Sequence, residues 1–336
     1  MPQGPILVVD DEPINLDAMR LALGAVHKLI YARDGGSALE AIARHKPSLV
    51  LLDIRMPGMD GYEVCRAIKA NPATEYLPVI FVTSLSDVGD EARGFEAGGV
   101  DFIVKPISPL VVRARVQTHL SLVKHSRLER SHRDAIFMLS EAGHFNDHDT
   151  GAHVWRMAAY SAELARAAGW SVESCRLMEL AAPLHDTGKI GVPTTILAKP
   201  GPLDEAEWAV MRQHPQMGHE ILSKSAAPVF QMAAEIALNH HEKWDGSGYP
   251  HGIAGTAIPE SARIVAIADV YDALTMKRAY KEPWPAEQAL AHIAEQQGRQ
   301  FDPHLAGIFL TLAPKLVDIH RRWQQQSSPV LPPLVA

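Results

Sequence analysis

Short apolar runs alternate with amphipathic stretches over the first 105 residues. The apolar runs have hydrophobic residues at consecutive positions, as strands buried on both faces do. These runs cover residues 6–9, 48–52, 79–82 and 102–104. Apolar residues at helical spacing occupy residues 13–24, 36–45, 62–70 and 87–97. The alternation predicts an α/β domain over residues 1–122, with a doubly wound parallel sheet of five strands.

The stretch 108–141 has no strand pattern. Its apolar residues recur roughly at helical or heptad spacing, with charged residues between them. These residues are Val112, Val116, Leu120, Val123, Leu128, Ala135 and Met138. The spacing predicts one long connecting helix. This helix either pairs with its copy in a coiled-coil homodimer or packs only on its own domain.

Residues 142–318 predict a second domain that is almost entirely helical. Amphipathic stretches follow one another and are interrupted by loops that contain Gly and Pro, at 188–201 and 245–255. The segment 319–336 ends in a proline-rich sequence and is expected to be a disordered tail. The chain is therefore expected to hold two domains joined by a helical linker.

The composition narrows the possible functions. A formal net charge of −7 without a sustained basic stripe argues against a nucleic-acid binder. No apolar stretch is long enough to span a bilayer, so membrane insertion is not expected. The only cysteines, Cys65 and Cys175, imply no disulfide framework, which favours a cytoplasmic location. The 17 histidines lie mostly after residue 140, and histidine is a common metal ligand.

Polar residues mark the ends of the predicted strands in the first domain. Asp10 and Asp11 follow the run 6–9, Asp53 follows the run 48–52, Thr83 follows 79–82 and Lys105 follows 102–104. Ligands bind at the carboxyl ends of parallel strands, and converging carboxylates suit Mg²⁺. Asp53 is then a nucleophile for a phosphoryl group, whose oxygens Lys105 and Thr83 contact.

These residues lie in motifs that resemble the receiver domains of two-component response regulators. The motifs are VVDDEP, LLDIRMPGMDGYE, FVTS and DFIVKP, and the resemblance covers residues 4–122. It implies phosphorylation of Asp53 by a cognate histidine kinase. It also implies that Asp10 and Asp11 hold Mg²⁺ with Asp53, and that the domain switches through Thr83 and Lys105.

The second domain concentrates histidines and aspartates at the ends of predicted helices. Adjacent His-Asp and His-His pairs suggest side chains that converge on more than one metal ion. The candidate residues are Asp149, His153, His185, Asp186, His214, His240, His241 and Asp269. Mixed nitrogen and oxygen ligands fit Fe, Mn, Co, Ni or Zn and do not choose among these metals.

Two of the aspartates have distinct expected roles. Asp186 is the natural carboxylate to bridge two metals during an in-line phosphoryl displacement. Asp269 lies in an otherwise apolar run, where a buried carboxylate needs a compensating cation. The reaction also needs cations for the phosphate charge, and Lys189, Arg278 and Lys281 follow the two aspartates closely in the sequence.

The motifs of residues 130–315 are similar to those of HD-GYP domains. They include HDTGK at 185–189 and HHEKWDGSGYP at 240–250, supported by DTGAH, RQHPQMGHEIL, RIVAIADVYDALTMKRAYK and GRQFDPHL. The resemblance implies an all-α HD-superfamily fold and hydrolysis of cyclic di-GMP to pGpG, GMP or both. It assigns Lys189, Arg278 and Lys281 to phosphate binding. It assigns as metal ligands His153, His185, Asp186, His214, His240, His241 and Asp269.

Position 149 departs from the family pattern. HD-GYP domains that hold a third metal usually have a glutamate there, whereas this chain has Asp149. The shorter side chain either still reaches a third metal or leaves a site with two metals.

Three functions stay open at this point. The first is a cyclic di-GMP phosphodiesterase that the receiver regulates, with Asp186 and Lys189 as catalytic residues. The second is an adaptor that binds the nucleotide or a diguanylate cyclase without turnover, and the third is a phosphohydrolase for another nucleotide. The complete set of ligands favours catalysis. The loop 246–250 either shapes the substrate pocket or meets a partner such as the cyclase domain.

Overall fold

The computed structural model describes residues 4–84, 88–144, 151–276 and 282–325. The chain divides into two compact units, Met1–Ser131 and His132–Ala336. Among the described residues, no helix combines the length and apolar character that a membrane span requires.

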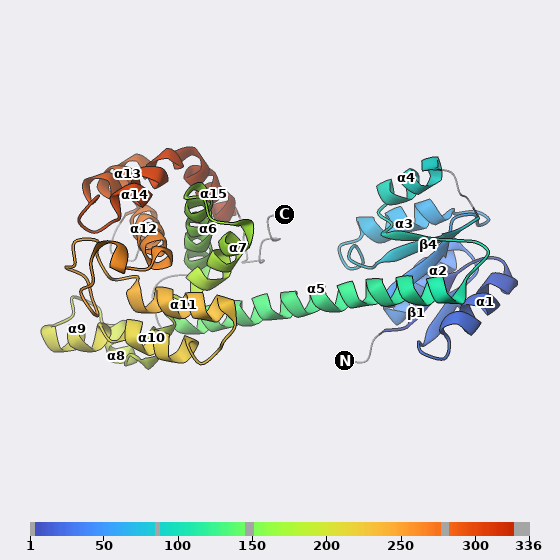
Figure 1. Ribbon diagram of the computed structural model, residues 1–336, viewed down its shortest axis with the longest axis horizontal. Coiled ribbons are helices and arrows are strands. Elements are labelled where there is room, and N and C mark those ends of the chain that lie inside the picture. The colour runs from blue at the N-terminus through green and yellow to red at the C-terminus, as the bar shows by residue number, and fades with distance from the viewer. Residues whose placement is uncertain (1–3, 85–87, 145–150, 277–281, 326–336) are drawn as a thin grey trace. The chain divides into compact units, whose positions relative to one another are not determined.

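The first unit is built on a parallel five-stranded sheet with the order β2-β1-β3-β4-β5 (Figure 1). The strands are β1 (Ile6–Val9), β2 (Leu29–Ala32), β3 (Leu49–Asp53), β4 (Val79–Thr83) and β5 (Asp101–Val104). The predicted doubly wound fold is confirmed. Strand β2 was not predicted, although all of its residues, Leu29–Ala32, are apolar. It lies at the edge of the sheet, and its Tyr31 is exposed.

Alternate strand residues build two separate cores, one on each face of the sheet. Leu7 and Val9 of β1 pack with α2 (Gly35–His45) and α3 (Gly61–Ala70). Ile6 and Val8 pack on the opposite face, against α1 (Pro13–Leu23) and the first turns of α5 (Pro109–His144). The remaining helix of this unit is α4 (Val88–Glu96). Burial on both faces explains why strands β1, β3 and β4 consist of consecutive apolar residues.

Helix α5 contributes to both units, and the predicted connecting helix is confirmed. In the first unit its buried residues are Val112, Val116 and Leu120. In the second unit Ile136 joins the core, and the buried Ser140 hydroxyl donates to the carbonyl oxygen of Pro183 at 2.8 Å. Leu128, between these groups, is 52% exposed, so the apolar spacing seen in the sequence does not end in burial there.

The second unit is all helical among its described residues, as predicted. Its α-helices are α6 (Gly151–Ala167), α7 (Val172–Ala181), α8 (Thr194–Leu197), α9 (Glu205–Met211), α10 (His214–Leu222), α11 (Pro228–Asn239), α12 (Glu260–Thr275), α13 (Ala286–Glu295), α14 (Pro303–Thr311) and α15 (Ala313–Gln325). Three short 3-10 helices lie between them, namely η1 (Ala182–Leu184), η2 (Thr187–Gly191) and η3 (Gly255–Ala257).

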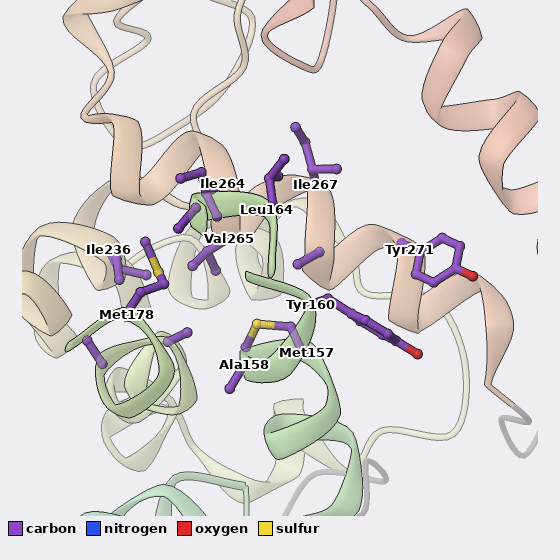
Figure 2. Packing of buried hydrophobic residues seen from close by; sticks show 14 of the residues in the cluster. Met157, Ala158, Tyr160, Leu164, Met178, Ile236, Ile264, Val265, Ile267 and Tyr271 are labelled. Atoms are coloured by element: carbon purple, nitrogen blue, oxygen red, sulfur yellow. The ribbon is translucent and has the colours of Figure 1, made fainter. Parts of the chain in front are cut away.

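Helix α12 is the centre of this unit. Figure 2 shows Ile264, Val265 and Ile267 of α12 packed among Leu164 of α6 and Met178 of α7. Every residue of α12 is buried or partly buried, and none is exposed. A polar residue of α12 must therefore be paired or must face the site that the surrounding helices leave open.

The disordered tail expected over residues 319–336 is wrong for its first seven residues, and residues 326–336 lie outside the described part of the chain. Residues 319–325 belong to α15, where Ile319 is buried and Trp323 packs against the core. Apolar residues at helical spacing therefore outweigh the proline-rich sequence that follows them.

Candidate functional site

The first candidate site lies at the carboxyl edge of the sheet. Asp10 follows β1 and Asp53 ends β3, and both are buried. The Lys105 ammonium lies 2.8 Å from Asp53 Oδ2 and 2.9 Å from Asp10 Oδ2. Thr83 ends β4 and is also buried, whereas Asp11 is exposed. The five predicted residues therefore come from strand ends at one edge, as the parallel order requires.

The electrostatics of this pocket fit a divalent cation. Burial raises the pKa of Asp53, Lys105 acts against this shift, and Asp10 adds to it. One oxygen from each of Asp10, Asp11 and Asp53 lies within 4.8 Å of the others. Three carboxylates carry more negative charge than one lysine neutralises. Oxygen ligands grouped in this way suit Mg²⁺.

The second candidate site is built at the ends of helices. His185 follows η1, Asp186 precedes η2, and His214 is the first residue of α10. His240 and His241 directly follow α11. At such positions a side chain projects beyond the packed helices, so several elements can direct ligands to one point.

A glycine allows two of these elements to meet. Gly188 of η2 packs so closely on α10 that an added Cβ would lie 1.9 Å from the carbonyl oxygen of His214. The same Cβ would lie 2.5 Å from the backbone nitrogen of Gly218. Only glycine permits this approach, which brings the HDTGK segment beside the start of α10.

Asp186 lies at the centre of the cluster. Its Oδ1 is 3.3 Å from His214 Nε2 and 3.6 Å from His240 Nε2. Its Oδ2 is 3.1 Å from His185 Nε2 and 2.8 Å from Lys189 Nζ. The two oxygens of one buried carboxylate therefore face two different groups of side chains.

Backbone carbonyls fix the orientation of three imidazoles. Nδ1 of His185 donates to the Ala182 oxygen at 3.0 Å, and Nδ1 of His214 donates to the Met211 oxygen at 2.8 Å. His240 Nδ1 donates in the same way, to the Ala237 oxygen at 3.0 Å. A carbonyl only accepts, so Nδ1 carries a proton, and Nε2 keeps its lone pair whenever the ring is neutral. This is the arrangement that metal-binding histidines use.

The ligand atoms of this cluster are also buried and grouped as a metal ion requires. The Nε2 atoms of His214 and His240 are buried and make no hydrogen bond with the described residues. One atom from each of Asp186, His214, His240 and His241 lies within 4.8 Å of the others. Buried lone pairs directed at a shared carboxylate are expensive unless a cation binds them.

The protonation tendencies of His240 and His241 agree with this fit. Burial lowers the pKa of His240, and burial together with His240 and His214 lowers the pKa of His241 further. Neutral imidazole is the form that binds metals. Burial alone would lower the pKa of His185, but Asp186 and Asp269 outweigh it and raise this pKa to about 9. The carboxylates thus supply enough negative charge to hold a cation beside His185.

The other side of the cluster contains His153 of α6 and Asp269 of α12. His153 Nε2 lies 3.7 Å from Asp269 Oδ1. The burial expected for Asp269 is wrong, because its side chain is 25% exposed. The buried carboxylate of this apolar run is Asp272, one turn further along, which is fully buried.

Asp272 and Arg156 support His153, and the sequence reasoning missed both residues. Asp272 accepts a hydrogen bond from His153 Nδ1 and is paired with Nε and Nη2 of Arg156. Burial would raise the pKa of Asp272, but His153 and Arg156 outweigh it and hold this pKa below its usual value. The sequence did contain one indication of Asp272, because it lies three residues after Asp269 and therefore one helical turn away.

Three predicted site residues cannot be placed. Asp149, Arg278 and Lys281 lie outside the described residues. Their proposed roles, in a third metal site and in phosphate binding, stay predictions.

The fold and the two sites define a class of protein. A doubly wound sheet with an acidic edge precedes a helical unit with a histidine-aspartate cluster. Family models match both parts, the response regulator receiver domain over residues 6–117 and the HD domain over residues 123–305. The chain is a response regulator whose output domain is of the HD type.

Relatives place the chain within this class. It is 40% identical to a probable cyclic di-GMP phosphodiesterase of Vibrio cholerae, over 98% of this chain and 82% of that protein. It is 39% identical to the cyclic di-GMP phosphodiesterase response regulator RpfG of Xanthomonas campestris, over 91% of this chain and 86% of that protein. A 3'3'-cGAMP-specific phosphodiesterase of V. cholerae is 46% identical over 54% of this chain and 35% of that protein. The chain belongs to the family of response regulators in which a receiver domain precedes an HD domain.

The support beneath His153 gives a testable prediction. Replacement of Asp272 by Asn should lower the free energy of unfolding by about 3–5 kcal/mol, because it leaves the buried Arg156 charge unpaired. It should also weaken metal binding roughly 10–100-fold, since His153 loses its carboxylate partner. Chemical denaturation and metal titration of the full chain measure the two effects.

A double variant separates these effects. The combination Arg156→Met with Asp272→Leu removes both charges, so most of the stability should return while metal affinity stays low. Recovery of full metal affinity in this variant would contradict the positioning role of Asp272.

Proposed function

We propose that the chain hydrolyses cyclic di-GMP and that phosphorylation of its receiver domain regulates this activity. The observation that carries the proposal is the position of Asp186, whose two oxygens face separate groups of ligands. A carboxylate in this position is suited to bridge two metals for an in-line displacement at phosphorus. The two relatives that match along most of the chain are named as cyclic di-GMP phosphodiesterases, which supports this substrate.

The proposed metals are two transition-metal ions from the group Fe, Mn, Co, Ni and Zn. Asp186 would bind both metals, His214, His240 and His241 one of them, and His153, His185 and Asp269 the other. When bound, such metals polarise the phosphodiester and lower the pKa of a bound water. Asp149 is the proposed ligand of a third metal.

The protein's own cations would act on the phosphate. Lys189 is paired with Asp186, and its side chain is 16% exposed, so its ammonium lies beside the cluster. With cations bound to the carboxylate, the Lys189 ammonium would contact the developing charge of the phosphoryl oxygens. Arg278 and Lys281 are proposed to bind the second phosphate.

Replacement of Asp186 by Asn should abolish turnover while the fold stays largely intact. An amide is nearly isosteric but lacks the charge that holds two cations together. Hydrolysis of cyclic di-GMP and metal content per chain are the two measurements. Near-normal hydrolysis with unchanged metal content would exclude the binuclear site.

Replacement of Lys189 by Ala should reduce hydrolysis more than metal binding, because its ammonium is proposed to contact phosphate. An activity loss on the order of 10²–10³-fold is expected from removal of one stabilising contact to the transition state. Metal stoichiometry is measured beside activity. A parallel loss of both would instead make Lys189 a structural support of Asp186.

A second substrate has specific support. The relative named as 3'3'-cGAMP-specific shares 46% identity over the HD-type part of the chain. A panel of cyclic di-GMP, 3'3'-cGAMP and cyclic di-AMP separates these substrates. Binding of cyclic di-GMP without hydrolysis of any member, in metal-loaded protein, would leave the adaptor function.

The receiver is proposed to accept a phosphoryl group from a histidine kinase on Asp53, with Mg²⁺ held by Asp10, Asp11 and Asp53. A homodimer through the exposed side of α5 and a diguanylate cyclase partner at the loop 246–250 remain further predictions. The cytoplasmic location also remains a prediction.

Helix α5 offers a route from the receiver to the cluster. Its Ser140 hydroxyl donates to the Pro183 carbonyl, two residues before His185. A Cβ built on Gly143 would lie 3.3 Å from the Thr187 Cα, next to Asp186. At its other end, the first turns of α5 belong to the receiver core through Val112. A change in receiver packing that moves α5 would therefore act on the HDTGK segment.

An acyl-phosphate mimic tests this route. Beryllofluoride should change the hydrolysis rate of the wild type and leave Asp53→Ala unchanged. Ser140→Ala should reduce the difference between the rates with and without beryllofluoride, because it removes a buried contact between α5 and Pro183. If the wild-type rates with and without beryllofluoride are identical while the receiver site is demonstrably saturated, the receiver serves only as a docking module.

A further inference from the structure

A row of planar side chains leads outward from the histidine cluster. The ring of Tyr249 stacks on the ring of His241, with centroids 4.7 Å apart and an interplanar angle of 25°. The Arg212 guanidinium carbon lies 5.7 Å from the centroid of Tyr249 and 5.8 Å from that of Trp208. Arg212 follows α9 and lies two residues before His214. The row thus connects a proposed metal ligand with the surface of α9.

The outer end of the row is accessible. Trp208 is 42% exposed, and Arg212 is exposed as well. Arg212 makes no ion pair with a carboxylate of residues 4–84, 88–144, 151–276 or 282–325. Lys199, not Arg212, pairs with the nearby Glu207. The Arg212 guanidinium is therefore held by rings alone and keeps its hydrogen-bond donors for a ligand.

Packing within α9 alone does not account for this arrangement. A guanidinium beside a tryptophan four residues earlier in the chain is an ordinary local pair that adds little at an exposed site. Arg212, however, also lies against Tyr249, from a loop 37 positions later in the chain, whose hydroxyl-bearing ring covers His241. The two rings thus place the guanidinium at the edge of the cluster.

We propose that Trp208 and Arg212 form the surface that binds a guanine base of the substrate. This inference rests on the proposed phosphodiesterase function and deepens it. A nucleotide holds its base one sugar away from its phosphate. A phosphate at the histidine cluster would therefore place a base one or two contacts further out, and Tyr249, Arg212 and Trp208 lie at such positions.

The chemistry of the two side chains fits a purine and selects guanine. Every base can stack on an aromatic ring, so Trp208 contributes affinity without strong base preference. The planar fork of Arg212 matches the N7 and O6 acceptors of guanine. Adenine offers N7 beside an amino donor, which would face a donor of Arg212 without forming a hydrogen bond. Arg212 is thus the specificity residue and Trp208 the stacking residue.

A substrate without a base provides the test for Trp208. In Trp208→Ala, kcat/KM for cyclic di-GMP should fall roughly tenfold, mainly through KM, as expected for the loss of a stacked base. Hydrolysis of bis(4-nitrophenyl) phosphate should not change. Trp208→Phe should recover much of the loss. Val172→Ala, which alters another exposed apolar side chain of the same unit, should match the wild type with both substrates.

A conservative variant provides the test for Arg212. Arg212→Lys keeps the positive charge but loses the planar fork. The ratio of kcat/KM for cyclic di-GMP to that for cyclic di-AMP should therefore fall, by roughly tenfold for one bidentate contact. An unchanged ratio would overturn the role of Arg212 in base selection.

Other outcomes separate this inference from the proposed function. Equal losses with cyclic di-GMP and the base-free substrate in Trp208→Ala would make Trp208 a support of the metal site. Wild-type turnover of the base-free substrate alone would refute the proposed function. Affinity for cyclic di-GMP, measured on the metal-loaded full chain, then decides the inference. It survives only if the wild type binds and Trp208→Ala binds roughly tenfold more weakly.

Discussion

The charge of the buried Asp186 carboxylate is the constraint on which the second unit depends. Its two oxygens face imidazoles on one side and His185 with Lys189 on the other. A carboxylate in this environment is stable only when cationic groups surround it. The local fold answers this need, because Gly188 packs η2 against α10 and thereby brings His214 to Asp186. Carbonyl acceptors at Nδ1 then turn the Nε2 atoms toward the same carboxylate.

The receiver unit has a different fold but also contains a buried carboxylate that is paired with a lysine. Asp53 is buried beside Asp10, and Lys105 lies 2.8 Å from its carboxylate, as Lys189 does from Asp186. In each site one lysine neutralises only part of the acidic charge. Both sites therefore favour a metal cation together with a phosphoryl group, whose oxygens the lysine can contact. One fold directs this chemistry from strand ends, and the other directs it from helix ends.

The sequence predicted those features that depend on local pattern. Strands buried on both faces gave consecutive apolar residues, whereas the short apolar run of the edge strand β2, with the exposed Tyr31, was not identified as a strand. The ligand candidates followed from paired polar residues at element ends. Arg156 escaped prediction because its partner Asp272 is 116 residues away, and no local spacing reveals such a pair. The burial of Asp269 was predicted wrongly for a related reason. An apolar run predicts a buried helix but not which of its faces opens into a site.

The tertiary contacts that the sequence did not reveal also explain why the HD-type unit can respond to a signal. Most of the ligands come from the ends of helices, and one of these ends is joined to α5 by the hydrogen bond from Ser140 to Pro183. The core around α12 is close-packed and resists deformation, so a small movement of α5 cannot be absorbed there. It would instead act on the segment that carries His185 and Asp186, because α5 contacts this segment at Pro183 and at Thr187. Since catalysis depends on ligand positions to a fraction of an ångström, a displacement too small to alter the fold is sufficient to alter the reaction.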